Sequence, residues 1–336
     1  MVRPLHLILV LALVSPILAK GQQAKAPSFA FATIQQGREI LTNRDDFVLA
    51  LSPFDRAARM KTDQNVPERD YLDFVARNVL DWDAAEKELV QSALEDLQPR
   101  LEALALPFPE NILFIKTTGA EEGGAEYTRA NAIILPQSTL KSSRSNMRGI
   151  IAHELFHVLS RKNPPLKEKL YAAIGFQPCG EIVFPPTLAE RKITNPDAPR
   201  NDHCIRVKIG DESVWAVPIL FSTSARYDVA RGGEFFQYLN FQFLVVERKD
   251  SEPSAKASYD ASHPRLISPD KISGFYEQVG QNTDYIIHPE EILADNFKLL
   301  MLADNSKLLP LEKGVRSPEI LKKLAEALGT RIRLFE

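Results

Sequence analysis

The chain has 336 residues, 44% hydrophobic and 25% charged, which is typical of a globular protein and excludes a disordered or fibrous one. This length fits two domains or one large α+β domain with two lobes. The 41 basic and 44 acidic residues give a formal charge of -3, which excludes bulk electrostatic attraction to nucleic acid or to anionic lipid.

Residues 1–19 are typical of a signal peptide. Arg3 precedes an apolar run at 7–14, and Ala19 stands before the charged Lys20. The run is too short to span about 30 Å of hydrocarbon as a helix, so an uncleaved membrane anchor is the less favoured alternative. No second apolar run of spanning length follows. We therefore expect a secreted or periplasmic protein without a stable membrane span after the signal peptide is removed.

The sequence contains two cysteines, Cys179 and Cys204, which are too few for a zinc site made of cysteine alone. Export places them in an oxidising compartment, where a disulfide between them is the default expectation. The alternative is a pair of buried thiols. A cysteine nucleophile is disfavoured, because a bridged cysteine cannot attack and no Cys-His pattern is present.

The N-terminal lobe, residues 20–163, is expected to combine helices and strands. Apolar residues recur at three and four positions in two segments, and Ser142 and Ser143 can cap a third helix. Two runs rich in apolar residues predict buried strands, with an acidic glycine-containing turn between them. The expected helices are 67–82, 84–105 and 144–159, and the expected strands are 111–117 and 127–135.

The C-terminal lobe, residues 164–336, is expected to contain helices at both ends and strands between them. A helical stretch comes first, and the segment 181–247 is then rich in β-type patterns. Helical periodicity returns near the end of the chain, where Ser317 can cap a helix and Gly329 can stop it. The expected helices are 166–174, 289–303 and 318–328. The expected strands are 204–209 and 214–221, which form a hairpin, and 235–246, which is one long strand or a strand pair.

His153, Glu154 and His157 form an HExxH motif in the helix that follows Ser143. Positions four apart lie on successive turns of one face, so the two imidazoles can converge on one ion with Glu154 beside them. The other residues of this segment are mostly apolar, so the helix is expected to be buried. Buried charged groups need partners, because an isolated charge in a medium of low dielectric constant costs several kcal/mol. A divalent cation meets this need.

A catalytic zinc ion needs three protein ligands and one position for water, so a third donor must come from elsewhere. Pro289 fits the first turn of a helix, which places Glu291 and Asp295 on one face at a four-residue spacing. Glu291 can reach the ion, and Asp295 can accept the N–H of a ligating histidine.

This pattern of HExxH followed by a helical Glu with Asp four residues later resembles the gluzincin class of zinc metallopeptidases, the thermolysin-like group. The resemblance implies that His153, His157 and Glu291 bind Zn2+, that Glu154 is the general base, and that Asp295 is the partner of His153. It also implies a zincin-like α+β fold, with the active-site helix packed on a mixed sheet, and a peptide or protein substrate. It covers the two ligand helices only.

The sequence departs from the gluzincin pattern in two ways. The β-rich segment 181–247 is expected as an insertion between the ligand helices, and Glu290 stands where the group often has Asn. His263, His203 and Glu181 are therefore alternative third ligands. His288 is expected to cap the second ligand helix and not to bind the metal.

In this class a sheet edge beside the zinc holds extended substrate by main-chain pairing. The segment 127–135 is placed in the sequence to be that edge, with Asn131 and Ala132 as candidates for contact with the substrate backbone. A purely structural strand is the alternative.

The expected reaction is hydrolysis of a peptide bond. Zinc lowers the pKa of its bound water toward about 7, and Glu154 takes the proton and passes it to the leaving amine. His263 and Tyr285 are the candidates for stabilising the oxyanion, and Tyr276 and Arg226 lie in comparable segments.

A hypothesis of a different class is an exported binding or assembly protein that holds a structural zinc ion. In that case His203 or Cys204 supplies a fourth ligand and no position remains for water. Zinc content and cleavage of a peptide library distinguish the two hypotheses.

Overall fold

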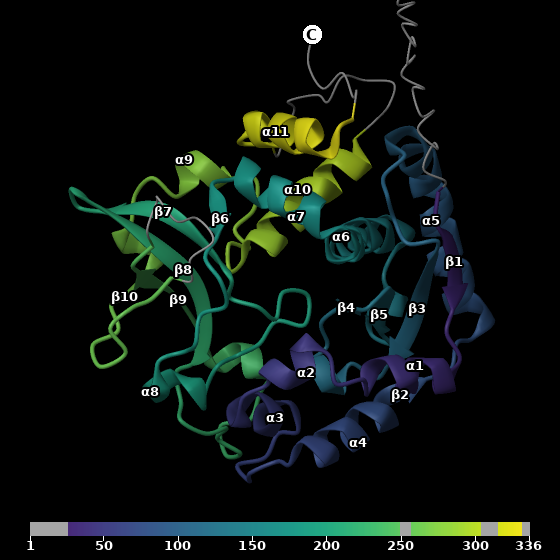
Figure 1. Ribbon diagram of the computed structural model, residues 1–336. Coiled ribbons are helices and arrows are strands. Elements are labelled where there is room, and N and C mark those ends of the chain that lie inside the picture. The colour runs from purple at the N-terminus through teal and green to yellow at the C-terminus, as the bar shows by residue number, and fades with distance from the viewer. Residues whose placement is uncertain (1–25, 249–256, 304–314, 331–336) are drawn as a thin grey trace, which may run out of the picture.

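A computed structural model describes residues 26–248, 257–303 and 315–330. The expected signal peptide, residues 1–19, lies outside the described residues. The described chain has a mixed α+β architecture with two five-stranded sheets, which confirms the predicted fold class (Figure 1). In this view the first sheet, α1 and α5 lie on the right, α2 and α3 lie at the lower centre, the second sheet lies on the left, and α6, α7 and α10 lie between the two sheets.

The six expected helices are present as α4, α5, α6, α7, α10 and α11, and the expected strands correspond to β3, β4, β5, β7, β8 and β9. The other elements were not predicted, and the expected helix 67–82 ends at Asn78, where β2 follows. The helices are α1 Ile34–Leu41, α2 Asp46–Ala50, α3 Pro53–Arg59, α4 Glu68–Asn78, α5 Ala84–Leu104, α6 Arg144–Lys162, α7 Pro164–Ala173, α8 Pro186–Ala189, α9 Tyr276–Val279, α10 Pro289–Leu302 and α11 Pro318–Leu328. The strands are β1 Ser28–Phe31, β2 Val79–Leu80, β3 Asn111–Thr117, β4 Tyr127–Arg129, β5 Ala132–Pro136, β6 Phe176–Pro178, β7 His203–Ile209, β8 Glu212–Ser222, β9 Leu239–Val246 and β10 Leu266–Ile267.

The first sheet is mixed and has the order β1-β3-β5-β4, with β2 also paired to β3. β1, β3 and β5 are parallel, whereas β2 and β4 run antiparallel to their neighbours. Successive side chains of a strand point to opposite faces. Phe114 and Ile133 therefore pack with α5 and α6, whereas Ile115 and Ile134 pack with α1 and α4. Helices cover both faces, and β4 forms one edge of the sheet.

The second sheet lies in the chain between α6 and α10, as expected for a β-rich segment between the two motif helices. Its order is β10-β9-β8-β7-β6, and every pair is antiparallel. Ile205 and Phe243 on one face join the large core that α6, α7 and α10 also share. Trp215 and Leu244 on the other face form a separate apolar cluster.

Two expected strands are shorter than predicted. The segment 127–135 is a hairpin of β4 and β5, because Ala130 adopts a left-handed backbone with φ of 53° and reverses the chain together with Asn131. The segment 235–246 begins with a 3-10 turn, Phe235–Tyr238, before β9 starts. Apolar content alone does not distinguish one long strand from two short ones.

Local signals fix the starts of the two motif helices. The Ser143 hydroxyl accepts the Asn146 N–H at 3.2 Å and caps α6. His288 Nδ1 accepts the Glu290 N–H at 3.1 Å and caps α10, and Pro289 occupies the first turn. The expected capping role of His288 is confirmed, and the two helices pack against each other in the core.

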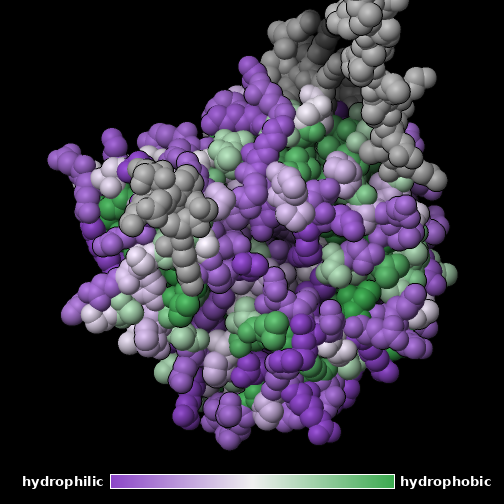
Figure 2. All heavy atoms as spheres, viewed as in Figure 1, coloured by the Kyte–Doolittle hydropathy of each residue, from purple (hydrophilic) through white to green (hydrophobic). Residues whose placement is uncertain are grey.

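The surface seen in Figure 2 is mostly hydrophilic, with hydrophobic side chains in scattered patches. None of the helices in the described part of the chain combines the length and the apolar content needed to cross a membrane.

Candidate metal centre

The facing sides of α6 and α10 bring together the three side chains that the sequence predicts as metal ligands. His153 Nε2 lies 3.2 Å from Glu291 Oε2, and His157 Nε2 lies 3.6 Å from the same oxygen. His157 and Glu291 are buried, with 0% and 2% exposed. One carboxylate oxygen therefore faces both rings.

The outer nitrogen of each ring is held by a different carboxylate. His153 Nδ1 lies 3.0 Å from Asp295 Oδ1, and His157 Nδ1 lies 3.2 Å from Glu290 Oε1. Since an ionised carboxylate only accepts hydrogen bonds, these contacts favour the tautomer with hydrogen on Nδ1. The Nε2 atom of each ring then faces Glu291 Oε2. Burial lowers the pKa of His153 and His157, but the surrounding carboxylates outweigh it and raise both pKa values, that of His157 to about 9. The predicted pairing of Asp295 with His153 is present in the structure.

Glu290 has a role that the sequence did not predict. Besides His157, it accepts hydrogen bonds from the hydroxyls of Ser160 and Tyr171, the latter at 2.5 Å. Burial raises the pKa of Glu290, but His157, Lys167 and the Ser160 hydroxyl outweigh burial and lower it to about 2. Glu290 therefore supports His157 as Asp295 supports His153.

The donors fit a bound divalent cation. Two imidazole Nε2 atoms face one carboxylate oxygen, so positive charge is needed between them, either as protons on the rings or as a bound cation that replaces those protons. His157 Nε2 is buried and makes no hydrogen bond, a situation that costs about 1–3 kcal/mol. Two imidazoles and one carboxylate form a common zinc-binding set, with the outer nitrogens held by carboxylates. These residues could hold a zinc ion.

Glu154 lies beside this cluster, with ligand atoms of His153, Glu154 and His157 all within 4.8 Å of one another. Its carboxylate is buried, and Oε2 has no hydrogen-bond partner. Burial raises the pKa of Glu154 to about 8, and the neighbouring Asp197 carboxylate adds to the increase. A carboxylate with such a pKa can exchange a proton near neutral pH.

Two further residues reach the cluster from the irregular segment between α8 and β7. Asn195 Nδ2 donates to Glu291 Oε1 at 2.6 Å and so turns the other oxygen, Oε2, toward the histidines. Asp197 forms a second group with His157 and Glu291, whose ligand atoms lie within 4.8 Å of one another. Neither residue was predicted, since no periodicity or motif spacing marks this segment.

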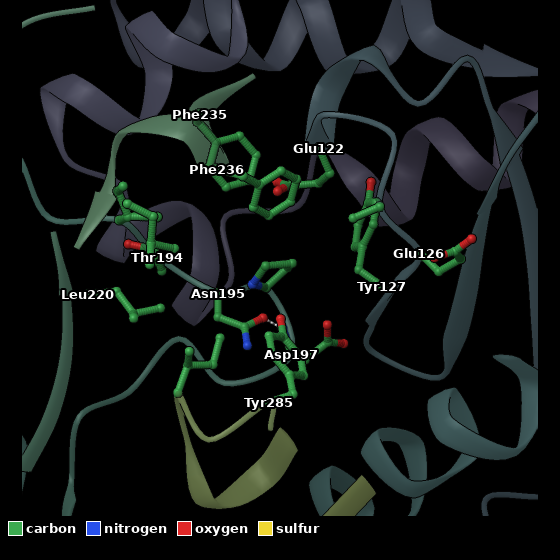
Figure 3. A pocket seen from close by; sticks show the side chains of 15 residues that line it. Glu122, Glu126, Tyr127, Thr194, Asn195, Asp197, Leu220, Phe235, Phe236 and Tyr285 are labelled. Carbon is green, nitrogen blue, oxygen red and sulfur yellow. Dashed lines mark hydrogen bonds between the residues drawn. The ribbon is translucent and has the colours of Figure 1, made fainter. Parts of the chain in front are cut away.

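A pocket of about 260 Å³ lies beside Asp197. Phe235 and Phe236 line one side, and Asn195, Asp197 and Tyr285 line the opposite side (Figure 3). Tyr285 is 43% exposed. The structure thus brings Tyr285 next to the cluster, while its expected role with an oxyanion stays a prediction.

The structure does not bring the other histidine candidates to the cluster. The His263 side chain is 86% exposed and contacts Asp260, in a surface hollow lined by β8 and β9. The His203 ring lies between Asp202 and Glu168, at 2.6 and 3.1 Å. The expectation that His263 stabilises an oxyanion is therefore corrected, and neither histidine is a third ligand.

Glu181 and two further oxyanion candidates also lie elsewhere. Glu181 accepts the Asn201 N–H at 3.0 Å and pairs with Arg200. Tyr276 is an exposed residue of α9, and Arg226 is exposed in the loop after β8.

Asn131 and Ala132 are not placed for contact with a substrate backbone. Asn131 lies in the hairpin turn, where its Nδ2 donates to the Asn111 carbonyl at 2.8 Å. Ala132 is buried in β5, which pairs with β3 on one side and β4 on the other. The sheet edge beside the cluster is β4. The predicted substrate-contact residues are therefore wrong, because they lie in the hairpin turn and in β5.

Cys179 and Cys204 are buried free thiols in this structure, so the expected disulfide is not formed. Cys204 lies in β7 opposite Gln177, and Cys179 directly follows β6, where its N–H donates to the Asp202 carbonyl at 2.8 Å. Both belong to the apolar cluster of the second sheet. Cys204 and His203, the expected fourth ligands of a closed site, are therefore not brought to the metal cluster.

Comparison of this chain with models of protein families gives no match, and neither do comparisons with curated proteins and with solved structures. Its function must therefore be argued from its own geometry.

Proposed function

We propose that this chain is a secreted or periplasmic zinc-dependent peptidase of the gluzincin type, with a zincin-like fold. One observation carries the proposal. The Nε2 atoms of His153 and His157 face a single oxygen of Glu291 at 3.2 and 3.6 Å. The outer nitrogen of each ring is already occupied by a carboxylate. Polar side chains in this arrangement are better explained by the binding of one cation than by packing in an apolar core.

Glu154 is the proposed general base. When bound, zinc supplies Lewis acidity, which acidifies a coordinated water and polarises a carbonyl. Glu154 takes a proton from the attacking water and delivers it to the leaving amine. A carbon–oxygen bond forms as the peptide C–N bond breaks. Burial and Asp197 raise the pKa of Glu154 to about 8 in the absence of a metal, and a bound cation would lower it and favour the ionised base.

The neighbouring pocket is the proposed site for substrate. Phe235, Phe236 and Leu220 give it an apolar wall, which suits an apolar side chain of a peptide. Tyr285, on the opposite side, is the proposed donor to the developing oxyanion (Figure 3). The side of β4 that faces away from β5 is the proposed edge for main-chain pairing.

A second candidate is a closed metal site in an exported binding or assembly protein. Asp197 favours it, because its carboxylate lies with His157 and Glu291 at metal-ligand separations. A fourth protein ligand would leave no place for water.

The test combines metal analysis with cleavage of a peptide library. Glu154→Gln should retain stoichiometric zinc and lose nearly all turnover, because the amide cannot accept the proton while both imidazoles stay in place. Glu212→Gln, on a surface residue paired with Arg265, is the matched control and should keep both. Wild-type zinc without any chelator-sensitive cleavage would favour the closed site. Full activity in Glu154→Gln would overturn the proposed role of Glu154.

A further inference from the structure

Residues 194–198, here named the strap, cross from the second lobe to the metal cluster. Thr194 fixes one end on the first lobe, since its N–H and hydroxyl donate to Asp55 at 3.1 and 2.8 Å. The Thr194 carbonyl accepts from Arg59 at 3.0 Å, and all three of these residues are buried. The strap is therefore held by a buried polar network and not by apolar packing alone.

We propose that the strap holds the site of the proposed peptidase closed, with the Asp197 carboxylate as a fourth metal donor. This inference rests on the proposed function, which it extends to the regulation of the site. Opening the strap removes Asp197 from the donor set and frees the edge of β4.

The position of Asp197 supports its role as a donor. Its Oδ1 accepts both the N–H and the hydroxyl of Thr128, each at 2.7 Å. Both hydrogen bonds fall on one oxygen, so the carboxylate keeps acceptor capacity for a cation. Its ligand atom lies within 4.8 Å of those of His157 and Glu291. A carboxylate that is fixed from one side and faces two metal ligands is suited to complete their sphere.

The strap also occupies the main-chain groups that a substrate would use. Thr128 lies opposite Ile133 of β5, and its N–H is directed to Asp197 on the other side of β4. The Thr128 carbonyl accepts from Arg161 Nη2 at 3.4 Å. An extended peptide pairs with an edge strand through such outward N–H and C=O groups. At Thr128 both groups already have partners within the chain.

Arg161 ties the strap to the motif helix. It lies one turn beyond His157 on α6. Its Nη2 donates to the carbonyls of Pro196 and Asp197 at 3.4 and 3.2 Å, and its Nη1 donates to the Thr128 hydroxyl at 2.8 Å. One guanidinium thus joins the helix, the edge strand and the strap.

The loop that carries the strap is anchored where it leaves and rejoins the second sheet. It runs from the end of β6 to the start of β7, and these strands pair with each other. Residues 195–198 can therefore move away from the cluster about Thr194, which stays hydrogen-bonded to Asp55 and Arg59, without breaking either sheet. The interactions to be broken are those of Asp197 with Thr128, of Asn195 with Glu291, and of Arg161 with the two strap carbonyls.

The test uses the full mature chain loaded with Co2+, whose visible absorption reports its ligands, and azide as an added ligand. Azide should bind Asp197→Ala at least tenfold more tightly than it binds the wild type, because the substitution vacates a coordination position. Asp197→Asn keeps an oxygen for the Thr128 hydrogen bonds and should lie between the two. Asp202→Asn, in the same loop but paired with His203, is the matched control and should resemble the wild type.

Amide hydrogen exchange and peptide cleavage give two further tests of the inference. In the wild type the Thr128 amide should exchange with solvent at least tenfold more slowly than in Asp197→Ala. Peptide cleavage should be at least tenfold faster in Asp197→Ala than in the wild type. Equal azide affinity in both proteins, or rapid exchange of the wild-type Thr128 amide, would overturn the inference.

The two proposals can fail separately. If no variant cleaves peptides but azide still distinguishes Asp197→Ala from the wild type, the peptidase is refuted while Asp197 remains a metal ligand. If cleavage depends on Glu154 but Asp197→Ala is no faster than the wild type, the peptidase stands and the closing role of the strap is refuted.

Discussion

Replacing Asp295 by alanine tests whether the outer carboxylates prepare the histidines for a metal. In the structure Asp295 Oδ1 accepts from His153 Nδ1 at 3.0 Å, and Asp295 Oδ2 accepts from the Thr283 hydroxyl at 2.5 Å. The Asp295→Ala variant leaves His153 without this partner. The ring can then rotate or change tautomer, and either change misdirects Nε2 away from Glu291.

The expected loss of zinc affinity follows from the solvent exposure of the His153–Asp295 pair. The His153 and Asp295 side chains are 16% and 24% exposed, so solvent screens their hydrogen bond only in part. A hydrogen bond to a charged group contributes about 1.5–3 kcal/mol, and loss of such a partner weakens metal binding by about 10- to 100-fold. We expect zinc affinity to fall within that range in Asp295→Ala. Asp295→Asn should lose about tenfold or less, because the amide oxygen can still accept from Nδ1.

The assay is competition for zinc with a chromophoric chelator at fixed pH, with circular dichroism as the check on folding. Asp284→Ala is the matched control, because that side chain is 97% exposed and lies 4.0 Å from the end of Arg316. It should bind zinc as the wild type does. A folded Asp295→Ala variant with unchanged zinc affinity would refute the role given to the outer carboxylates.

Two predictions concern the buried network that anchors the strap. Arg59 is fully buried and pairs with Asp55 and Glu122 at 2.7 and 2.8 Å, so Arg59→Met should lower the free energy of unfolding by about 3–5 kcal/mol, measured in urea. A loss below about 1 kcal/mol would contradict the pairing. Burial outweighs Arg59 and raises the pKa of Glu122 to about 7. The folded state then binds more protons than the unfolded state from about pH 4.5 to 7, so stability falls as pH rises through this window. Glu122→Gln should make this slope shallower by the contribution of one carboxyl group, because Glu154, with a pKa of about 8, contributes in the same direction. Unfolding curves of both proteins across that range check it.

The sequence was sufficient wherever side-chain positions depend on local periodicity. The four-residue spacings of His153 with His157 and of Glu291 with Asp295 fix which residues share a helix face, whatever the rest of the chain does. Capping by His288 is likewise a local property. Apolar runs also located most strands, although they could not show the reversal at Ala130, which depends on one backbone angle.

Only the tertiary structure decided which distant segments meet at the two motif helices. Glu290 became the partner of His157 because α6 and α10 pack at one register, and His263 was left on the surface of the second lobe. Asn195 and Asp197 lie in an irregular segment, where no repeating geometry links sequence spacing to direction in space. Their approach to Glu291 depends on the placement of both sheets and on the hydrogen bonds of Arg161, Thr128 and Thr194. Periodicity assigns a residue to a face, but long-range packing determines what that face meets.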